Sequence, residues 1–321
     1  MKKQIIFMFS GQGSQYYQMG KELHENHAQF RYWMDHCDEM VHSLIQTSLI
    51  DILYRGAGKS ESFDRLLYTN PALLCIEYSL VNVLKGMGIQ PDFLMGYSLG
   101  EITASVVSGS ISLEDGIRLV VDLARLAEEN IQQAEMLSIM ESKVIMVELP
   151  DLFHHCWLTG TNFQKNFVVC GLSNAIRQLR EGLNKKNIVS QILPVQFGFH
   201  TELIDSYEEK YKQLIRKINL LPGKIPMISS LKSEIIRELN EDHLWDVIRY
   251  PVNFEQTVNW ILKKGDYIFI DAGPSGSLAT FVRYILPSNS QSIPLQLINQ
   301  FGKDLNSIEK LRTSLFHEAE T

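Results

Sequence analysis

A serine stands at the centre of the pentapeptide Gly96-Tyr97-Ser98-Leu99-Gly100, a G-x-S-x-G pattern typical of nucleophilic serines. The apolar run Phe93-Leu94-Met95 precedes it, and residues 101–107, which favour a helix, follow it. Strand, sharp turn and helix make a nucleophile elbow, in which the turn exposes the hydroxyl and glycines allow close packing. The N–H of Leu99 then lies at a helix start, where it can hold an oxyanion. The pattern also occurs by chance in loops, but its flanks favour a nucleophile.

A serine nucleophile needs a general base, and His200 is the histidine whose surroundings suit that role. The other histidines of the chain lie in polar or helical surroundings. His200 follows an expected strand over 191–196 and the turn Phe197-Gly198-Phe199, and it precedes a helix start at Thr201-Glu202. A histidine at a strand-to-helix corner beside a glycine suits a general base. A capping or core histidine is the alternative, and position alone leaves both open.

The remaining reactive residues predict neither a metal site nor disulfides. His154 and His155 adjoin Cys156, but adjacent side chains on a strand face opposite ways and no second ligand cluster is visible. The four cysteines form no C-x-x-C pattern, and Cys75 and Cys170 lie in apolar runs, as buried free thiols do. We therefore expect no bound metal and a reducing compartment, the cytoplasm.

Composition argues against several classes of partner. The chain has 321 residues, of which 45% are hydrophobic, so a substantial core can form. Its formal net charge is -7 with both signs interspersed, and no basic stripe for nucleic acid is visible. The apolar run near the N-terminus is too short for a signal peptide, and no stretch is long enough to span a bilayer. We expect a cytoplasmic protein that binds neither nucleic acid nor membrane.

The elements expected around these residues alternate strands with helices. Expected strands run over residues 5–9, 93–95, 135–140, 143–149, 166–170, 188–195, 226–230 and 267–271. Expected helices run over residues 71–85 with Pro71 in the first turn, 112–126, 173–183, 202–220 and 243–263 with a break at Pro251. This alternation predicts a mostly parallel sheet covered on both faces, with a small α+β insert in the middle of the chain.

Four motifs together resemble those of malonyl-CoA:acyl-carrier-protein transacylases and of the acyltransferase domains of polyketide synthases. In chain order they are Phe9-Ser10-Gly11-Gln12-Gly13-Ser14-Gln15, Gly96-Tyr97-Ser98-Leu99-Gly100-Glu101, Phe197-Gly198-Phe199-His200 and Asp271-Ala272-Gly273-Pro274-Ser275-Gly276. The resemblance extends from about residue 5 to about residue 285. It implies an α/β fold, with a large α/β-hydrolase-like domain over 1–130 and 197–321 and a small ferredoxin-like subdomain over 131–196.

The same resemblance implies roles for individual residues. Ser98 would be acylated by a thioester, and His200 would take its proton and later activate the acceptor, in ping-pong turnover. Gln12 and the N–H of Leu99 would form the oxyanion hole. The family orients its histidine through a backbone carbonyl rather than an aspartate, and the aligned carbonyl here belongs to about Val247.

The resemblance also implies what else takes part in the reaction. No bound cofactor is needed, because CoA or phosphopantetheine arrives as the thioester arm of the substrate. The partner would be an acyl-carrier protein, and the protein would be a monomer. Phe199, next to the base, would shape the acyl pocket.

Position 123 departs from the malonyl-transferring members, which hold the free carboxylate of the substrate with an arginine there. At about 100° per residue, Arg125 points roughly 200° and Arg118 roughly 140° away from Leu123, so neither shares its face. An alignment slip of one or two residues is the alternative. Burying a carboxylate without a partner is costly, so Leu123 predicts an apolar acyl group in place of malonyl.

Tyr97 is a second departure, because most transacylases carry histidine there. Either the family tolerates an aromatic residue, or the change alters pocket shape or acyl-enzyme hydrolysis. With these two departures, the chain is similar to free-standing, arginine-lacking homologues from trans-acyltransferase polyketide synthases. Those homologues hydrolyse stalled acyl groups from carrier proteins. We therefore favour hydrolysis of non-carboxylated acyl groups. The alternatives are a transacylase that loads a carrier protein, a silent docking protein and a lipase-like hydrolase.

Overall fold

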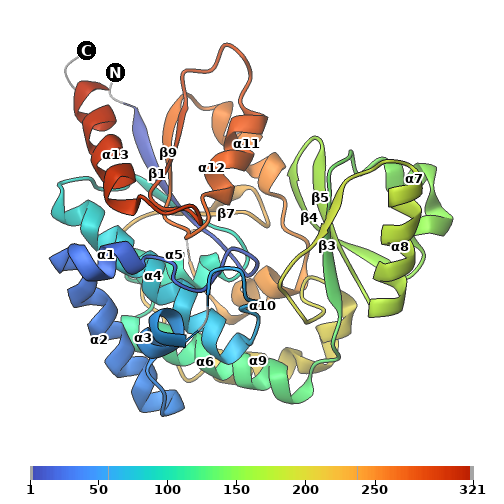
Figure 1. Cartoon of the computed structure of the whole chain (residues 1–321), viewed down its shortest axis with the longest axis horizontal. Helices are drawn as coiled ribbons and strands as arrows, with labels where there is room; N and C mark the ends of the chain where they lie inside the picture. The colour runs from blue at the N-terminus through green and yellow to red at the C-terminus, as the bar shows by residue number, and fades with distance from the viewer. Residues whose placement is uncertain (1–2, 57, 237, 319–321) are drawn as a thin grey trace.

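A large α/β unit and a smaller sheet unit lie side by side (Figure 1). The computed structural model describes residues 3–56, 58–236 and 238–318. The chain builds the first half of the large unit, crosses into the small unit, and returns to complete the large unit. No helix in these ranges is both long and apolar enough to cross a membrane.

Six strands form the sheet of the large unit, in the order β10-β9-β1-β2-β7-β8. They are β1 Gln4–Phe9, β2 Phe93–Gly96, β7 Met227–Ser229, β8 Glu234–Ile236, β9 Tyr267–Asp271 and β10 Ile293–Gln296. All neighbours run parallel except β8, which pairs antiparallel with β7 at the edge. β2 and β9 flank β1, so the strand order reverses around β1. Open α/β sheets bind their ligands at the carboxyl ends of strands at such a point.

Helices cover both faces of this sheet. Ile5, Phe7 and Phe9 of β1 pack into one core, whereas Ile6 and Met8 pack into the other, as expected of a buried parallel strand. The α-helices of the large unit are α1 Lys21–Asn26, α2 Ala28–Ile45, α3 Leu49–Asp51, α4 Leu66–Gly86, α5 Gly100–Ser108, α6 Leu113–Asn130, α9 Glu208–Ile215, α10 Glu241–Arg249, α11 Phe254–Leu262, α12 Ser277–Ile285 and α13 Asp304–Glu318. A π-helix, Ile52–Gly56, and a 3-10 helix, Glu202–Tyr207, complete this unit.

The small unit has the β-α-β-β-α-β order of a ferredoxin-like fold. Its elements are β3 Glu135–Ile139, α7 Ile145–Glu148, the 3-10 turn Pro150–Phe153, β4 Cys156–Phe163, β5 Asn166–Gly171, α8 Ser173–Lys185 and β6 Ser190–Ile192. The strands form an antiparallel sheet in the order β4-β5-β3-β6. α7 and α8 lie on its outer side, so the other face of the sheet is turned toward the large unit (Figure 1). The predicted fold class, an α/β domain with a small α+β part, is confirmed.

Several predicted elements need correction. Residues 143–149 form one helical turn rather than a strand, with Ile145 buried and Val147 exposed, because a short apolar run fits either period. Strand β4 was not predicted, since Gly160 interrupts its pattern at an irregularity in the strand pairing. The helix expected over 202–220 is a 3-10 helix followed by α9, and Pro71 lies inside α4 rather than in its first turn. Helix α6 begins as predicted after Ser112, whose side chain caps it.

Candidate active site

The predicted elbow lies where β1 and β2 end side by side. The N–H of Tyr97 donates to the Phe9 carbonyl over 2.8 Å, which joins the elbow to the end of β1. A Cβ on Gly100 would stand 2.2 Å from that same oxygen, and one on Gly96 would stand 2.3 Å from the Glu101 nitrogen. Ser98 adopts a φ of 53°, which L-residues rarely take up and which presents its side chain at the turn.

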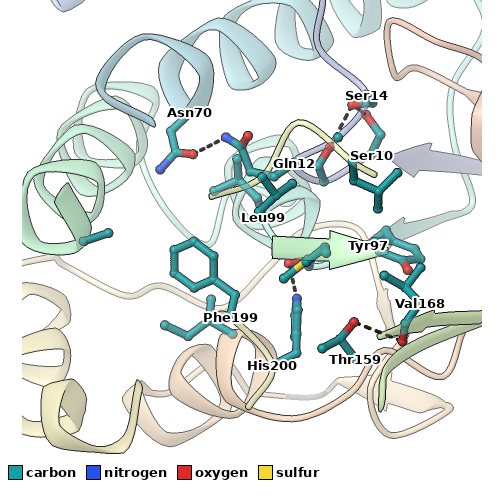
Figure 2. Close-up of a pocket in the computed structure, with 18 of the residues that line it drawn as sticks. Ser10, Gln12, Ser14, Asn70, Tyr97, Leu99, Thr159, Val168, Phe199 and His200 are labelled. Carbon is teal, nitrogen blue, oxygen red and sulfur yellow. Dashed lines mark hydrogen bonds between the residues drawn. The ribbon is translucent and has the colours of Figure 1, made fainter. Parts of the chain in front are cut away.

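His200 lies against Ser98, as predicted. Its Nε2 is 2.8 Å from the Ser98 hydroxyl oxygen, and its Nδ1 is 2.8 Å from the carbonyl oxygen of Tyr250 (Figure 2 shows the first contact). A carbonyl only accepts, so Nδ1 carries the hydrogen and Nε2 is left to accept the serine proton. The backbone also fixes His200, since its N–H donates to the Ile248 carbonyl over 2.8 Å.

The prediction that Val247 supplies this carbonyl was wrong, and Tyr250 takes its place. Val247 lies within α10, whereas Tyr250 follows the end of the helix with φ -102° and ψ 154°. The next residue, Pro251, disfavours helical geometry in Tyr250, so the Tyr250 carbonyl turns away from the helix axis toward His200.

Burial sets the protonation state of this histidine. His200 is only 7% exposed, and desolvation lowers its pKa to about 4, although the Tyr250 carbonyl opposes the shift. The imidazole is therefore neutral near pH 7 and can accept a proton from Ser98.

The two predicted oxyanion donors, Leu99 and Gln12, differ in which of their N–H groups are left to bind an oxyanion. Leu99 lies at the N-terminus of α5, and its N–H meets no acceptor within the described parts of the chain. The Gln12 side-chain amide is already engaged, because its Nε2 donates to Asn70 Oδ1 (Figure 2) and, over 2.9 Å, to Thr69 Oγ1. The donor that Gln12 still offers is its backbone N–H, which faces no other acceptor in the described residues.

A buried carboxyl group that the sequence did not reveal holds the Gln12 loop. Glu77 Oε1 accepts from the Ser10 N–H over 2.7 Å and from the Ser10 hydroxyl over 2.8 Å. Ser10 in turn contacts Ser14, whose hydroxyl donates to the Gly11 carbonyl. Burial raises the pKa of Glu77 to about 8, so it is largely neutral in the folded protein near pH 7. The sequence signal for this buried carboxyl group was one acidic residue within the apolar stretch that forms α4.

A cavity of about 200 Å³ opens onto Ser98, and residues of both units line it. Leu123, Phe199 and Tyr97 line it, as predicted. The large unit also contributes Leu126, Ala127, Ile131, Ile204, Tyr207, Tyr211, Trp245 and Ile248, and the small unit contributes Met136, Ser138, Thr159, Asn162, Val168, Leu193 and Val195. No lysine, arginine, aspartate or glutamate lines the cavity in the described parts of the chain.

The two arginines nearest to Leu123 in sequence point elsewhere. Arg118 pairs on the surface with Glu114 over 3.2 Å. Arg125 pairs with Asp122 over 3.3 Å, and it donates to a backbone carbonyl of α2 over 2.6 Å. The helical spacing therefore assigned the faces of α6 correctly, because Leu123 faces the cavity and both arginines face away from it.

Tyr97 connects the elbow to the small unit. Its hydroxyl donates to Asn162 Oδ1 on β4 over 2.8 Å, and Asn162 Nδ2 donates to Asn166 Oδ1 over 2.6 Å. A Cβ on Gly160 would lie 2.8 Å from the Tyr97 hydroxyl oxygen, so the small residue on β4 leaves room for the phenol. This contact joins segments far apart in sequence, and no local pattern could have indicated it.

Comparison with known proteins agrees with this architecture. Residues 6–319 match the family described as "Acyl transferase domain". The chain belongs to this family. It is therefore an acyl-transferring enzyme, and its site can be considered in those terms.

Two relatives from bacilli are similar to this acyltransferase over 98% of both chains. They are the polyketide biosynthesis acyltransferase homolog BaeD of Bacillus velezensis and PksD of Bacillus subtilis, each 36% identical to it. The malonyl CoA-acyl carrier protein transacylase of Bacillus subtilis is 27% identical, over 88% of this chain and 90% of its own. A solved loading acyltransferase from the avermectin modular polyketide synthase superposes with a TM-score of 0.88 at 23% identity, over 97% and 99% of the two chains.

Proposed function

We propose that this acyltransferase removes non-carboxylated acyl groups from acyl-carrier protein during polyketide biosynthesis, through an acyl-enzyme on Ser98. The observation that carries the proposal is the cavity, which opens onto a serine–histidine pair yet contains no charged lining residue within the described ranges. The names of the relatives that align over nearly the full chain support the pathway, and the transacylase relative supports the carrier protein as partner.

The proposed first half-reaction forms the acyl-enzyme. His200 Nε2 takes the proton of the Ser98 hydroxyl while its oxygen attacks the thioester carbonyl carbon. The backbone N–H groups of Leu99 and Gln12 hold the oxyanion, each for about 3 kcal/mol of transition-state stabilisation. The carbon–sulfur bond then breaks, and the leaving phosphopantetheine thiolate takes the proton from His200. The thioester arm belongs to the substrate, and no bound cofactor takes part.

In the second half-reaction an acceptor attacks the acyl-serine ester. His200 takes the proton of a water molecule, whose oxygen attacks the carbonyl carbon, and returns a proton to Ser98 as the ester bond breaks. Water yields a free acid, whereas a second phosphopantetheine thiol would yield a loaded carrier. Hydrolysis is the outcome we favour, and transfer to a carrier is the second candidate, which the 27% identity to a transacylase supports.

The cavity lining accounts for the proposed acyl preference. A malonyl group would bring its carboxylate into an apolar site, where an unpaired charge costs several kcal/mol. Leu123 lines the cavity at the position where malonyl-transferring relatives are expected to carry an arginine, and neither Arg118 nor Arg125 lines the cavity. Acetyl and longer neutral chains meet no such penalty.

Carrier proteins loaded with acetyl, butyryl or malonyl groups test this proposal. Each would be incubated with the enzyme, or with the Ser98→Ala variant as control, and the carrier mass followed with time. We expect rapid loss of acetyl and butyryl groups, slow loss of malonyl, and no loss with the control. Prompt release of malonyl with the simple acyl groups untouched would overturn the proposal. Adding an empty carrier as acceptor separates transfer from hydrolysis.

A further inference from the structure

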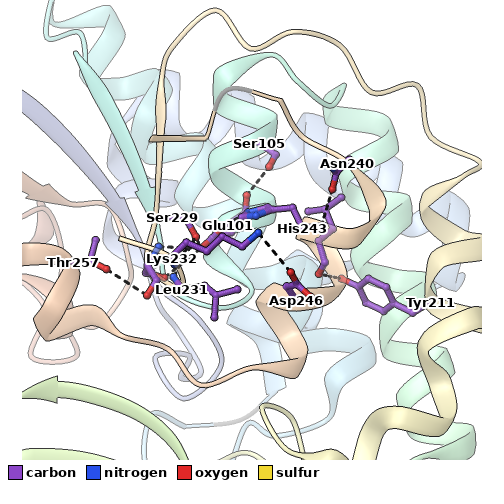
Figure 3. A network of polar contacts seen from close by, with 12 residues as sticks. Glu101, Ser105, Tyr211, Ser229, Leu231, Lys232, Asn240, His243, Asp246 and Thr257 are labelled. Carbon is purple, nitrogen blue, oxygen red and sulfur yellow. Dashed lines mark hydrogen bonds and ion pairs between the residues drawn. The ribbon is translucent and has the colours of Figure 1, made fainter. Parts of the chain in front are cut away.

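A buried contact between a carboxylate and an imidazole joins α5, the helix that follows Ser98, to α10. His243 Nε2 on α10 is 2.8 Å from Glu101 Oε2 on α5, and the two side chains are 6% and 1% exposed (Figure 3). Neither residue takes part in the proposed proton transfers or bond changes. Buried polar groups need hydrogen-bond partners, so the surroundings of this pair are informative.

The second carboxylate oxygen of Glu101 also has partners. Glu101 Oε1 accepts from the Ser230 N–H over 3.1 Å and from the hydroxyls of Ser229 and Ser230, each over 3.3 Å. Ser229 is the last residue of β7, which pairs with β2 in the sheet, and Ser230 follows it. Glu101 is therefore fixed to the sheet by one oxygen and is left with the other to hold His243.

The contact between Glu101 and His243 completes a ring of contacts that links Ser98 to His200. On one side, the Glu101 N–H donates to the Ser98 carbonyl over 2.9 Å in the first turn of α5. On the other side, His243 belongs to α10, and the chain at the end of α10 supplies the Ile248 and Tyr250 carbonyls that hold His200.

We infer that Glu101 and His243 are positioning residues, which hold α10 against α5 and so set the placement of His200 relative to Ser98. This inference rests on the proposed function, in which those two side chains react together. A displacement of about 1 Å between reacting groups can cost about a hundredfold in rate, so a tie between the two supporting helices affects the chemistry. Neither Glu101 nor His243 is among the described residues that line the cavity, so changing the pair should leave substrate affinity unchanged.

The test compares two amides at position 243. The side-chain nitrogen of His243→Gln can still reach the Glu101 carboxylate, whereas His243→Asn is one methylene shorter and cannot. The control is Glu241→Gln on the same helix, which breaks a partly exposed pair with Arg216 and leaves the buried pair intact. All four proteins are labelled at Ser98 with a fluorophosphonate well below their melting temperatures, and kcat and KM are measured with an acetyl thioester.

We expect His243→Asn to lower the labelling rate and kcat by at least about tenfold with KM unchanged. His243→Gln should stay within about threefold of the wild type, and Glu241→Gln should match it. The inference is overturned if His243→Asn labels at the wild-type rate, or if both amides are slowed equally, since any change at 243 then acts through the fold alone. Failure of the wild type to label would instead reject the proposed function itself.

Discussion

The phenol of Tyr97 reaches from the nucleophile elbow to Asn162 on the small unit, where its hydroxyl donates a hydrogen bond of 2.8 Å. Both residues line the cavity, so this bond joins the wall formed by the large unit to the wall formed by the small unit. The sequence left open simple tolerance of an aromatic residue, altered acyl-enzyme hydrolysis and a change in pocket shape, and this contact favours a change in pocket shape.

Tyr97 and Gly160 should therefore be energetically coupled. Gly160→Ala places a Cβ about 2.8 Å from the phenol oxygen and should destabilise the wild type. The same change should cost at least about 1 kcal/mol less in a Tyr97→Ala background, because nothing then crowds the new methyl group. Urea unfolding of the four proteins of this cycle measures the coupling. Additive effects would show that the phenol does not lie over Gly160.

Leu123→Arg should exchange the acyl preference. A guanidinium facing the cavity can pair with a malonyl carboxylate, and a charge-assisted contact of roughly 1.5–3 kcal/mol corresponds to at least about tenfold. We expect a gain in kcat/KM for malonyl thioesters and a loss for acetyl thioesters. Leu123→Met, which keeps an apolar wall, is the matched control. If neither substrate responds to the arginine, Leu123 does not contact the acyl group.

The activity should persist to an unusually low pH. Desolvation lowers the pKa of His200 to about 4, and only the neutral imidazole can accept the proton of Ser98. Measured with a neutral acyl thioester, kcat/KM should stay level from about pH 7 down to about pH 5 and fall below that, with a midpoint near 4. A midpoint near the ordinary histidine value of 6.5 would mean that the site is far more hydrated than the structure indicates.

Glu77 should make the folded state less stable as the pH rises. Its pKa is raised from 4.5 to about 8 by burial, so the folded protein holds a proton that the unfolded chain releases. The stabilisation is complete below about pH 4.5 and is lost as the pH rises through about 8. Between about pH 6.5 and 8.5, above the pKa values of Asp271 and His200, the urea midpoint should fall more in the wild type than in Glu77→Gln. Equal slopes would show that Glu77 is ionised in the folded protein.

Local sequence determined part of this site and long-range packing determined the rest. Ser98 was predictable because its glycines and flanks encode the elbow, and Leu123 because helical spacing separates it from Arg118 and Arg125. Tyr250 was not predictable, since the identity of the free carbonyl depends on where α10 ends before a proline. Asn162 could not be found from the sequence either, because its partner Tyr97 lies 65 residues away on another unit.

The same distinction applies to the fold. The alternation of strands and helices predicted a covered parallel sheet, and β9 was placed at Tyr267–Asp271 with both ends correct. The secondary structure of short segments depended less on their own residues and more on packing. The run 143–149 is apolar enough for a strand, yet the packing of Ile145 against the small-unit core selects a helical turn.

The most direct measurement is a competition for Ser98. The enzyme would be mixed briefly with equal amounts of acetyl-CoA and malonyl-CoA and quenched in acid, and the adducts on the peptide that contains Ser98 would be resolved by mass. The proposed apolar acyl site predicts that acetyl-Ser98 predominates and that its signal decays to free serine in water. A malonyl adduct in excess of the acetyl adduct, stable until a carrier protein is added, would contradict it.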